Sequence, residues 1–530
     1  MAIKTTFKNI SKYLYLNHYL FLLVWSIPLI VFQGEYQSLL GHDEAYYATQ
    51  ARWIAEGKEW FSVQWWDTPI YDRAIGLQWL IAISYRFFGV SEITARLPNA
   101  IASILSILLT YSIGKKLINS SVSLLGACLL PMMFLWLHNS RVVSQDIVLT
   151  TFELIGIWAL LKGSTIKLKH TEFGLNILAG TTLGLGFCIK SFMVFLFPIA
   201  LLPYVLNKKI WRNLGIYIGI ALGSILPIAW LTASWQRYGF LPFEQMFGKL
   251  LHLRGSDPNL YNPDNSWFYY FWNLPANTLP WSLLAIYGIF LIWMKRKLFD
   301  NISLLIGYPL VLFCLLTLFS TRMPYYTLQI LPFWSLFAAY ALESLSFKKW
   351  FRVMIGSLGI LLLTISVLLS LSIVSTPSQV KPYLGLGFLA GTGWIIVNFL
   401  KTSSYWRFAV LIPIWIAIAL AGLTGVLSDR SPEVRVALQQ PTVANVLNSQ
   451  IVDFVIQADL DPTDPLVWAK NADHPNWLLL SFYTSKLGKQ VRSVSELSSG
   501  SYAWISPKAE KVDSLNPITS IKEWQLVHIK

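Results

Sequence analysis

The feature that most constrains this chain is a series of long apolar runs between residues 18 and 427. Each run approaches the roughly 20 residues that an α-helix needs to cross the hydrocarbon core of a membrane. The runs lie at 18–33, 96–114, 121–138, 142–161, 174–188, 191–206, 213–235, 277–294, 302–319, 325–345, 350–374, 384–400 and 406–427. Only 13% of the 530 residues are charged, against about a quarter in soluble domains. The sequence therefore predicts an all-α polytopic membrane protein with about 13 transmembrane helices, and it excludes a large soluble enzyme.

Basic residues predict which side of the membrane each connection faces, because Lys and Arg concentrate in cytoplasmic loops. One further apolar stretch, 74–88, is short for a span. If it does not cross, every later basic cluster falls on the same side as the N-terminal lysines. These clusters lie at 115–116, 162–169, 208–212, 295–297, 348–352 and 401–407. We therefore expect 74–88 to be an interfacial amphipathic helix. The expected extracytoplasmic segments are 34–95, 236–276 and 428–530.

The last of these segments differs in composition from the rest of the chain. It carries 10 Lys/Arg and 11 Asp/Glu, whereas the whole chain has a net charge of +14. The basic excess therefore flanks the apolar runs, which indicates a membrane surface and not a nucleic-acid partner. The sequence predicts a transmembrane domain over 1–427 and a small soluble α/β domain over 428–530. In the latter we expect strands at 465–469, 502–506 and 518–529 and a helix at 476–486.

Two adjacent carboxylates, Asp43 and Glu44, lie in a polar cluster that begins at Gly41, about eight residues after the first apolar run. Such a pair beside a membrane surface can act as a general base or hold a divalent ion. The alternative is structural, with Asp43 capping the following helix and Glu44 in its first turn.

Cationic side chains recur near the predicted outer ends of the helices. Arg73 follows Asp72 before the interfacial helix, and Asp146 opens the fourth run. The other candidates are Lys190, His252, Arg254 and Arg322. Ionisable residues at membrane depth are functional candidates. The alternative for a single Lys or Arg is that its side chain extends to the lipid headgroups. For Arg73 the alternative is a salt bridge to Asp72 or Asp43. Cations beside a carboxylate suit a lipid phosphate held next to a base.

These motifs together resemble the GT-C class of polyprenyl-phosphate-sugar glycosyltransferases, in particular the bacterial aminoarabinose (lipid A) transferases and the protein O-mannosyltransferases. The resemblance rests on an ordered set of segments: Asp43-Glu44-Ala45-Tyr46-Tyr47-Ala48, Tyr71-Asp72-Arg73, Arg96-Leu97-Pro98, Arg141 with Asp146, Lys190-Ser191, Trp267-Phe268-Tyr269-Tyr270 and Arg322-Met323-Pro324-Tyr325-Tyr326. Two departures stand out. Arg73-Ala74-Ile75 replaces the family's Lys-Pro-Pro, and Pro263-Asp264-Asn265 stands where a histidine usually precedes the aromatic run.

The resemblance implies roles for individual residues. Asp43 and Glu44 would be catalytic, and Arg73, Lys190, Arg254 and Arg322 would bind the donor phosphate. Tyr46, Tyr47, Tyr71, Asp72, Asp146 and Tyr326 would line the substrate pocket. No cofactor is certain; a divalent metal is possible, with Asp72 and His252 as candidate ligands.

The function that follows is an integral membrane glycosyltransferase of the bacterial inner (plasma) membrane. It would move a sugar from a polyprenyl-phosphate donor to a hydroxyl of a lipid, glycan or protein on the extracytoplasmic face, with inversion. The alternative is a polytopic transporter or a flippase for lipid-linked sugars, which would have charges along a central path and two related halves.

Overall fold

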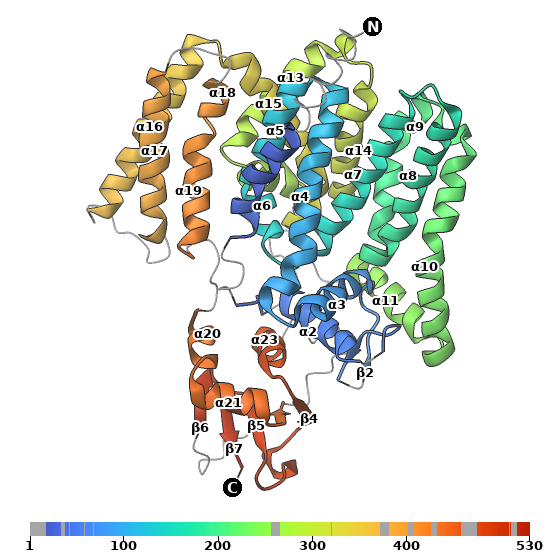
Figure 1. Ribbon diagram of the computed structural model, residues 1–530, viewed down its shortest axis with the longest axis vertical. Coiled ribbons are helices and arrows are strands. Elements are labelled where there is room, and N and C mark those ends of the chain that lie inside the picture. Colours follow the sequence, from blue (N-terminus) through green and yellow to red (C-terminus); the bar gives the residue numbers. More distant parts are fainter. Residues whose placement is uncertain are drawn as a thin grey trace, which may run out of the picture.

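The computed structural model describes most of the chain. The described residues are 17–32, 38–41, 43–57, 59–66, 68–255, 266–319, 321–371, 381–400, 406–425, 432–456, 474–507, 509 and 517–529. Figure 1 shows three layers: a helical bundle, a layer of short helices beneath it, and an α/β unit formed by the C-terminal part.

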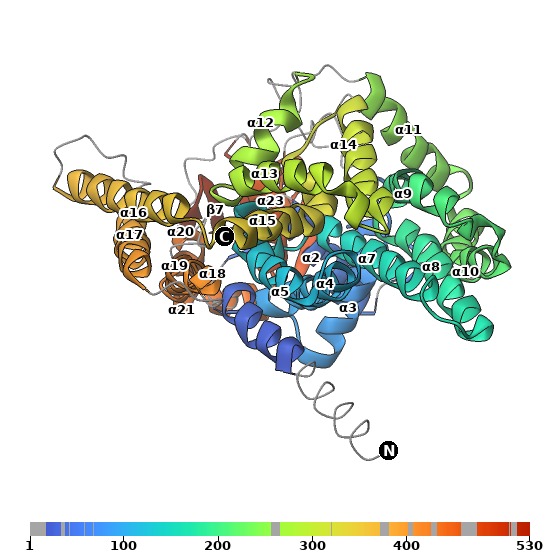
Figure 2. The same cartoon turned by 90° about the horizontal axis from the view of Figure 1, so that it is seen from above.

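The bundle contains a helix within each of the thirteen apolar runs. In chain order these are Asn17–Ile30, α4 (Glu92–Leu117), α5 (Ser120–Leu129) with η2 (Leu130–Met132) and α6 (Phe134–Ser140), α7 (Gln145–Gly163), α8 (Lys169–Lys190), η3 (Ser191–Phe195) with α9 (Leu196–Asn207), α10 (Leu214–Tyr238), α13 (Trp281–Met294), η7 (Ser303–Gly307) with α14 (Tyr308–Leu318), η8 (Pro324–Ile330) with α15 (Leu331–Leu345), α16 (Lys349–Ser370), α17 (Leu384–Phe399), and α18 (Trp406–Ala409) with α19 (Ile412–Leu423). Short turns η4 (Ile210–Arg212), η6 (Arg296–Leu298) and η9 (Lys381–Tyr383) lie in the connections. Seen from above, α16 and α17 lie at one end and α8 and α10 at the other (Figure 2).

The number of membrane crossings stays a prediction. Among the described residues, 6 helices are long and apolar enough to cross a membrane, or up to 8 if each of two bent pairs is one span, and the remaining apolar helices are shorter. One bent pair turns by 66° between Met132 and Phe134. The helix that ends there includes Pro131, and proline removes a backbone donor and kinks a helix.

Helices α8 and α10 pack with their backbones in close contact. A Cβ atom added at Gly180 or Gly184 of α8 would collide with the backbone of α10, and one at Gly219 or Gly223 would collide with that of α8. Pairs of small residues four positions apart allow such an approach between membrane helices. Glycine is therefore required at these four positions.

The short helices below the bundle come from the two predicted external loops. The first loop forms α2 (Asp43–Ala55), the strands β1 (Gln64–Trp65) and β2 (Thr68–Pro69), and α3 (Gly76–Phe88). The second forms α11 (Leu241–Gly255) and α12 (Tyr269–Ala276). The helix expected at 74–88 is thus α3, which lies at the end of the bundle and outside it (Figure 1). It buries Leu77, Ile81 and Tyr85 and exposes Phe87 and Phe88.

The C-terminal part forms a five-stranded sheet with helices against it. Its elements are α20 (Pro432–Leu438), α21 (Pro441–Ser449), β3 (Val452–Val455), α23 (His474–Tyr483), β4 (Leu487–Val491), η10 (Val494–Glu496), β5 (Tyr502–Ile505), β6 (Pro517–Ile521) and β7 (Trp524–His528). The strand order is β4-β3-β5-β7-β6. β3 pairs in parallel with β4 and β5, whereas β7 pairs antiparallel with β5 and β6.

The sequence predictions for this part have mixed outcomes. β5 and α23 lie where a strand and a helix were expected. The single strand predicted over 518–529 is wrong, because the chain turns at Lys522 and Glu523 (φ 48° and 71°) and forms a hairpin of β6 and β7. The strand predicted at 465–469 lies outside the described residues. β3 and β4 were not predicted.

Candidate active site

The centre of the candidate site is an ion pair between α2, in the layer of short helices, and the segment before α3. Asp43 is the first residue of α2. Its Oδ1 lies 2.7 Å from Nη2 of Arg73, and 52% of the Asp43 side chain is exposed. The carboxylate is therefore held in a defined place and is still open to a reactant.

Arg73 is surrounded by groups that keep it charged. Its Nε lies 3.2 Å from Oδ2 of Asp72, its Nη1 donates to the hydroxyl of Tyr47 at 2.7 Å, and its guanidinium carbon lies 5.0 Å from the ring centroids of both Tyr46 and Tyr47. Burial acts to lower the pKa of Arg73, but the neighbouring Asp43, Tyr47 and Asp72 outweigh it and place the pKa well above its ordinary value. The guanidinium is thus a permanent cation beside Asp43.

The two tyrosines are held in their neutral form. Burial raises the pKa of Tyr47 and of Tyr46 well above the usual value. Tyr46 donates its hydroxyl hydrogen to Oδ1 of Asp72 at 2.9 Å. Asp72 therefore has one oxygen bonded to Tyr46 and the other to Arg73, and it orients the guanidinium.

A second ion pair lies at the bundle end of the site. Lys190, the last residue of α8, pairs with Asp146 in the first turn of α7. The ammonium nitrogen of Lys190 also lies 4.7 Å from the ring centroid of Tyr326 and 5.2 Å from that of Tyr325. Asp146 interacts electrostatically with Asp43, so the two ion pairs belong to one polar region.

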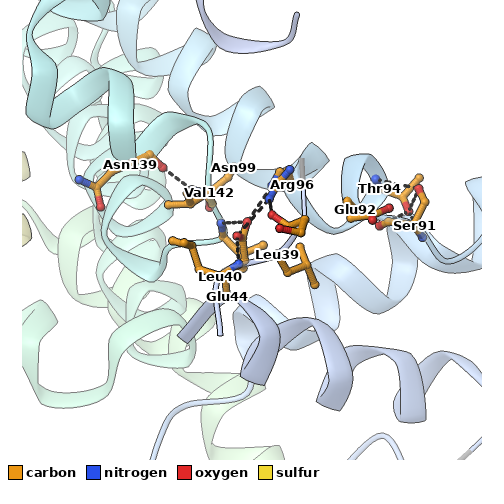
Figure 3. A network of polar contacts seen from close by, with 12 residues as sticks. Leu39, Leu40, Glu44, Ser91, Glu92, Thr94, Arg96, Asn99, Asn139 and Val142 are labelled. Carbon is orange, nitrogen blue, oxygen red and sulfur yellow. Dashed lines mark hydrogen bonds and ion pairs between the residues drawn. The ribbon is translucent and has the colours of Figure 1, made fainter. Parts of the chain in front are cut away.

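Glu44 differs from its neighbour Asp43 because it is buried, with 2% of its surface exposed. Its Oε1 accepts from Nε of Arg96 at 2.7 Å and from the backbone N–H of Val143 at 3.1 Å. Its Oε2 accepts from Nη2 of Arg96 at 3.1 Å and from the backbone N–H of Leu40 at 2.8 Å. Figure 3 shows this network. One carboxylate thus ties together the segment before α2, helix α4 and the segment that leads to Asp146.

The same network holds the connection between α6 and α7 from a second point. Asn99, one turn after Arg96 on α4, donates its Nδ2 to the backbone oxygens of Asn139 at 3.0 Å and Val142 at 2.7 Å (Figure 3). The catalytic role that the sequence predicts for Glu44 stays a prediction. The geometry favours a positioning role, because both of its oxygens are hydrogen-bonded to Arg96 and to backbone N–H groups.

We expect Glu44→Gln to destabilise the protein by roughly 1–3 kcal/mol, since the buried guanidinium of Arg96 then lacks its countercharge. The melting temperature of the purified protein would show this. Glu244→Gln is the matched control, because Glu244 is exposed on α11 and its replacement is expected to leave the melting temperature unchanged. Equal melting temperatures for both variants would contradict the structural role.

Two further predicted site residues contact structural groups. Tyr71 is fully buried, with its ring against Trp230 and Tyr238 of α10, which favours a supporting role.

Arg322 donates from Nε and Nη2 to the backbone oxygen of Thr317 near the end of α14, at 3.3 and 2.9 Å. A cation there is favourable because helix C-termini carry partial negative charge.

In the part of the chain that the structure describes, no cluster of ligands supports the predicted metal site. There, no group of three or more His, Cys, Asp or Glu side chains converges on a point. Asp72 already bonds Tyr46 and Arg73. His252 and Arg254 lie in α11, but their side chains are outside the described residues. We therefore derive no step through a metal.

The resemblance to the GT-C class of polyprenyl-phosphate-sugar glycosyltransferases, which the motifs predicted, is confirmed by comparison with known proteins. The family described as dolichyl-phosphate-mannose-protein mannosyltransferase matches residues 72–232. In fold, the chain is similar to the crystal structure of ArnT from Cupriavidus metallidurans bound to undecaprenyl phosphate, with a TM-score of 0.74, 16% identity and 97% of both chains covered.

Two curated relatives carry the resemblance at the level of sequence. The chain is 26% identical over 432 residues to undecaprenyl phosphate-alpha-4-amino-4-deoxy-L-arabinose arabinosyl transferase 2 of Pseudomonas fluorescens. The aligned region covers 76% of this chain and 72% of the relative. It is also 26% identical over 487 residues to the transferase of that description from Pseudomonas aeruginosa, covering 84% of this chain and 83% of the relative.

Proposed function

We propose that this protein transfers a sugar from a polyprenyl-phosphate carrier to an acceptor hydroxyl on the extracytoplasmic face of the membrane. The observation that carries the proposal is the pairing of Asp43 with Arg73 at 2.7 Å. It places a part-exposed carboxylate base beside a permanent cation, at the end of the bundle where the short helices gather (Figure 1). The family match and the fold support the same chemistry.

In the proposed reaction Asp43 accepts the proton of the acceptor hydroxyl. The oxygen attacks the anomeric carbon from the face opposite the phosphate, so configuration inverts. The bond between that carbon and the phosphate oxygen breaks, and its electron pair leaves with the lipid phosphate. Arg73 stabilises the charge that grows on this phosphate, which lowers the barrier because the charge is larger in the transition state than in the bound donor.

The remaining predicted residues act around this step. Lys190 is a second cation that can meet the phosphate, with Asp146 and the ring of Tyr326 fixing its position. Tyr46 and Tyr47 support Arg73, and Tyr47 offers a neutral hydroxyl beside it. Arg254 and Arg322 are proposed to act on the phosphate or its lipid.

An amino-pentose is the first donor sugar to test, since the relatives named above are 4-amino-4-deoxy-L-arabinose transferases. The test is transfer by the purified protein from synthetic polyprenyl-phosphate sugars to lipid A and to other hydroxyl acceptors. Release of free polyprenyl phosphate together with a glycosylated acceptor supports the proposal. Intact donor after prolonged incubation with every acceptor and sugar would contradict it.

The orientation is testable in intact cells by thiol labelling. Cys314 is exposed, so it is first replaced by Ala. Ser499→Cys in the C-terminal domain and Glu244→Cys on α11 are then expected to react with a membrane-impermeant reagent, whereas Lys208→Cys after α9 is the protected control. All three positions are exposed in the structure. Protection of Ser499→Cys or Glu244→Cys would contradict the extracytoplasmic assignment.

A further inference from the structure

The C-terminal domain contacts both segments that supply the Asp43–Arg73 pair. One contact is made by Arg52, near the end of α2 opposite to Asp43. It is 8% exposed, and its Nη1 donates to the backbone oxygens of Phe482 at 2.8 Å and Thr484 at 3.2 Å. Its Nη2 donates to that of Ser485 at 2.6 Å. These carbonyls end helix α23, where a buried cation is favourable.

The segment that precedes α2 is bonded by Tyr483, the last residue of the same helix α23. The hydroxyl of Tyr483 accepts from the backbone N–H of Leu39 at 3.1 Å and donates to Oε1 of Glu92 at 2.9 Å. Leu39 precedes Leu40, whose N–H bonds Glu44. Helix α23 therefore bonds both Arg52 near the end of α2 and the segment that precedes α2.

The second segment is anchored by Trp66, in the turn between β1 and β2. Its ring stacks on Trp477 of α23 with centroids 5.6 Å apart, and its Nε1 donates to the backbone oxygen of Gly488 in β4 at 2.9 Å. Its φ is 54°, a left-handed conformation that costs energy for a bulky residue. The surrounding contacts thus maintain strain in the turn that leads to Asp72 and Arg73.

We propose that the C-terminal domain is a clamp that sets the distance between Asp43 and Arg73, with Arg52, Tyr483 and Trp66 as positioning residues. The inference rests on the proposed transferase function. Each side chain of the ion pair comes from a separate segment, and each segment is fastened to the same domain. Reactive groups tolerate little displacement, since a shift of about 1 Å can cost roughly 100-fold in rate.

The sharpest test removes one hydroxyl group, and with it the hydrogen bonds to the Leu39 N–H and to Glu92. Tyr483→Phe is expected to lower kcat about 3- to 10-fold per folded molecule, the size of effect predicted by loss of the bond that holds Leu39, with the donor KM within about twofold. Arg52→Ala is expected to lower kcat further, and Arg52→Lys to restore part of it. The double variant Arg52→Ala/Tyr483→Phe should lose less than the product of the single losses, because both release the same helix. The matched controls are Tyr502→Phe on β5 and Arg492→Ala on the exposed surface of the domain, with wild-type kcat.

Hydrogen exchange of the amides of residues 43–49 separates the clamp from the transfer chemistry. Faster exchange in Tyr483→Phe and Arg52→Ala, and not in Tyr502→Phe, supports the clamp even if no donor has been found. If the wild-type protein is active, the clamp is overturned when both variants show the exchange rates and the kcat of the wild type. If the wild-type protein transfers no sugar, the proposed function fails, and unchanged exchange then overturns the clamp separately. Lower melting temperatures with unchanged kcat per folded molecule would also overturn it.

Discussion

Asp43→Asn is expected to lower kcat about 100- to 10,000-fold, the usual contribution of a general base. Asn keeps the size of the side chain and its place at the start of α2, but it cannot take up the acceptor proton. Replacing the carboxylate by a neutral amide also weakens the contact with Arg73, whose Nη2 lies 2.7 Å from the carboxylate in the wild-type protein. The rate of sugar transfer by purified protein at saturating donor is the measurement.

The control for Asp43→Asn is a variant that removes a different exposed carboxylate, outside the site. Glu244→Gln on α11 fits, because Glu244 is exposed, and we expect it to retain the wild-type rate. Donor binding by Asp43→Asn should remain close to that of the wild type. A transfer rate above about a third of the wild-type rate would remove Asp43 from the mechanism.

Arg73→Ala is expected to reduce kcat/KM about 10- to 150-fold, which corresponds to the loss of charge-assisted hydrogen bonds of roughly 1.5–3 kcal/mol. Arg73→Lys should keep appreciable activity, since an ammonium group retains the charge although it loses the planar fork of the guanidinium. Steady-state kinetics of the two variants side by side provide the test. A stable and fully active Arg73→Ala would refute the phosphate assignment.

The structure shows that Arg73 also bonds Asp72 and Asp43, so a purely structural role makes a different forecast. Under it, Arg73→Ala and Asp72→Ala would both lower the melting temperature, and the double variant would be strongly coupled in stability with no matching loss of rate. Melting temperature and transfer rate for the same three proteins separate the two roles.

The bundle could be predicted from sequence because its signal is local. Each apolar run predicts a helix from its own length and composition, and the helices that pack against it need not be known. The helix at 74–88 was predicted for the same reason, through its length and the basic residues around it. The turn at Lys522 and Glu523 was missed because neither residue is a usual turn former, and the left-handed conformation there gives no strong sequence signal.

The different environments of Asp43 and Glu44 could not be predicted from the pair itself. Successive helical residues point about 100° apart, so one carboxylate faces the open site while the next enters the core. Only the three-dimensional fold brings Glu44 to Arg96, 52 positions away. The contact of Arg52 with Phe482 spans 430 positions and likewise has no local signal.

The most direct test of the central claim is to follow both halves of the reaction in one sealed system. Purified wild-type protein and Asp43→Asn are reconstituted into vesicles with a labelled polyprenyl-phosphate sugar and an acceptor. We predict that the wild-type protein yields free polyprenyl phosphate and glycosylated acceptor in equal amounts, and that Asp43→Asn yields neither. Movement of intact lipid-linked sugar across the bilayer without cleavage of the sugar–phosphate bond would contradict the account and identify a flippase instead.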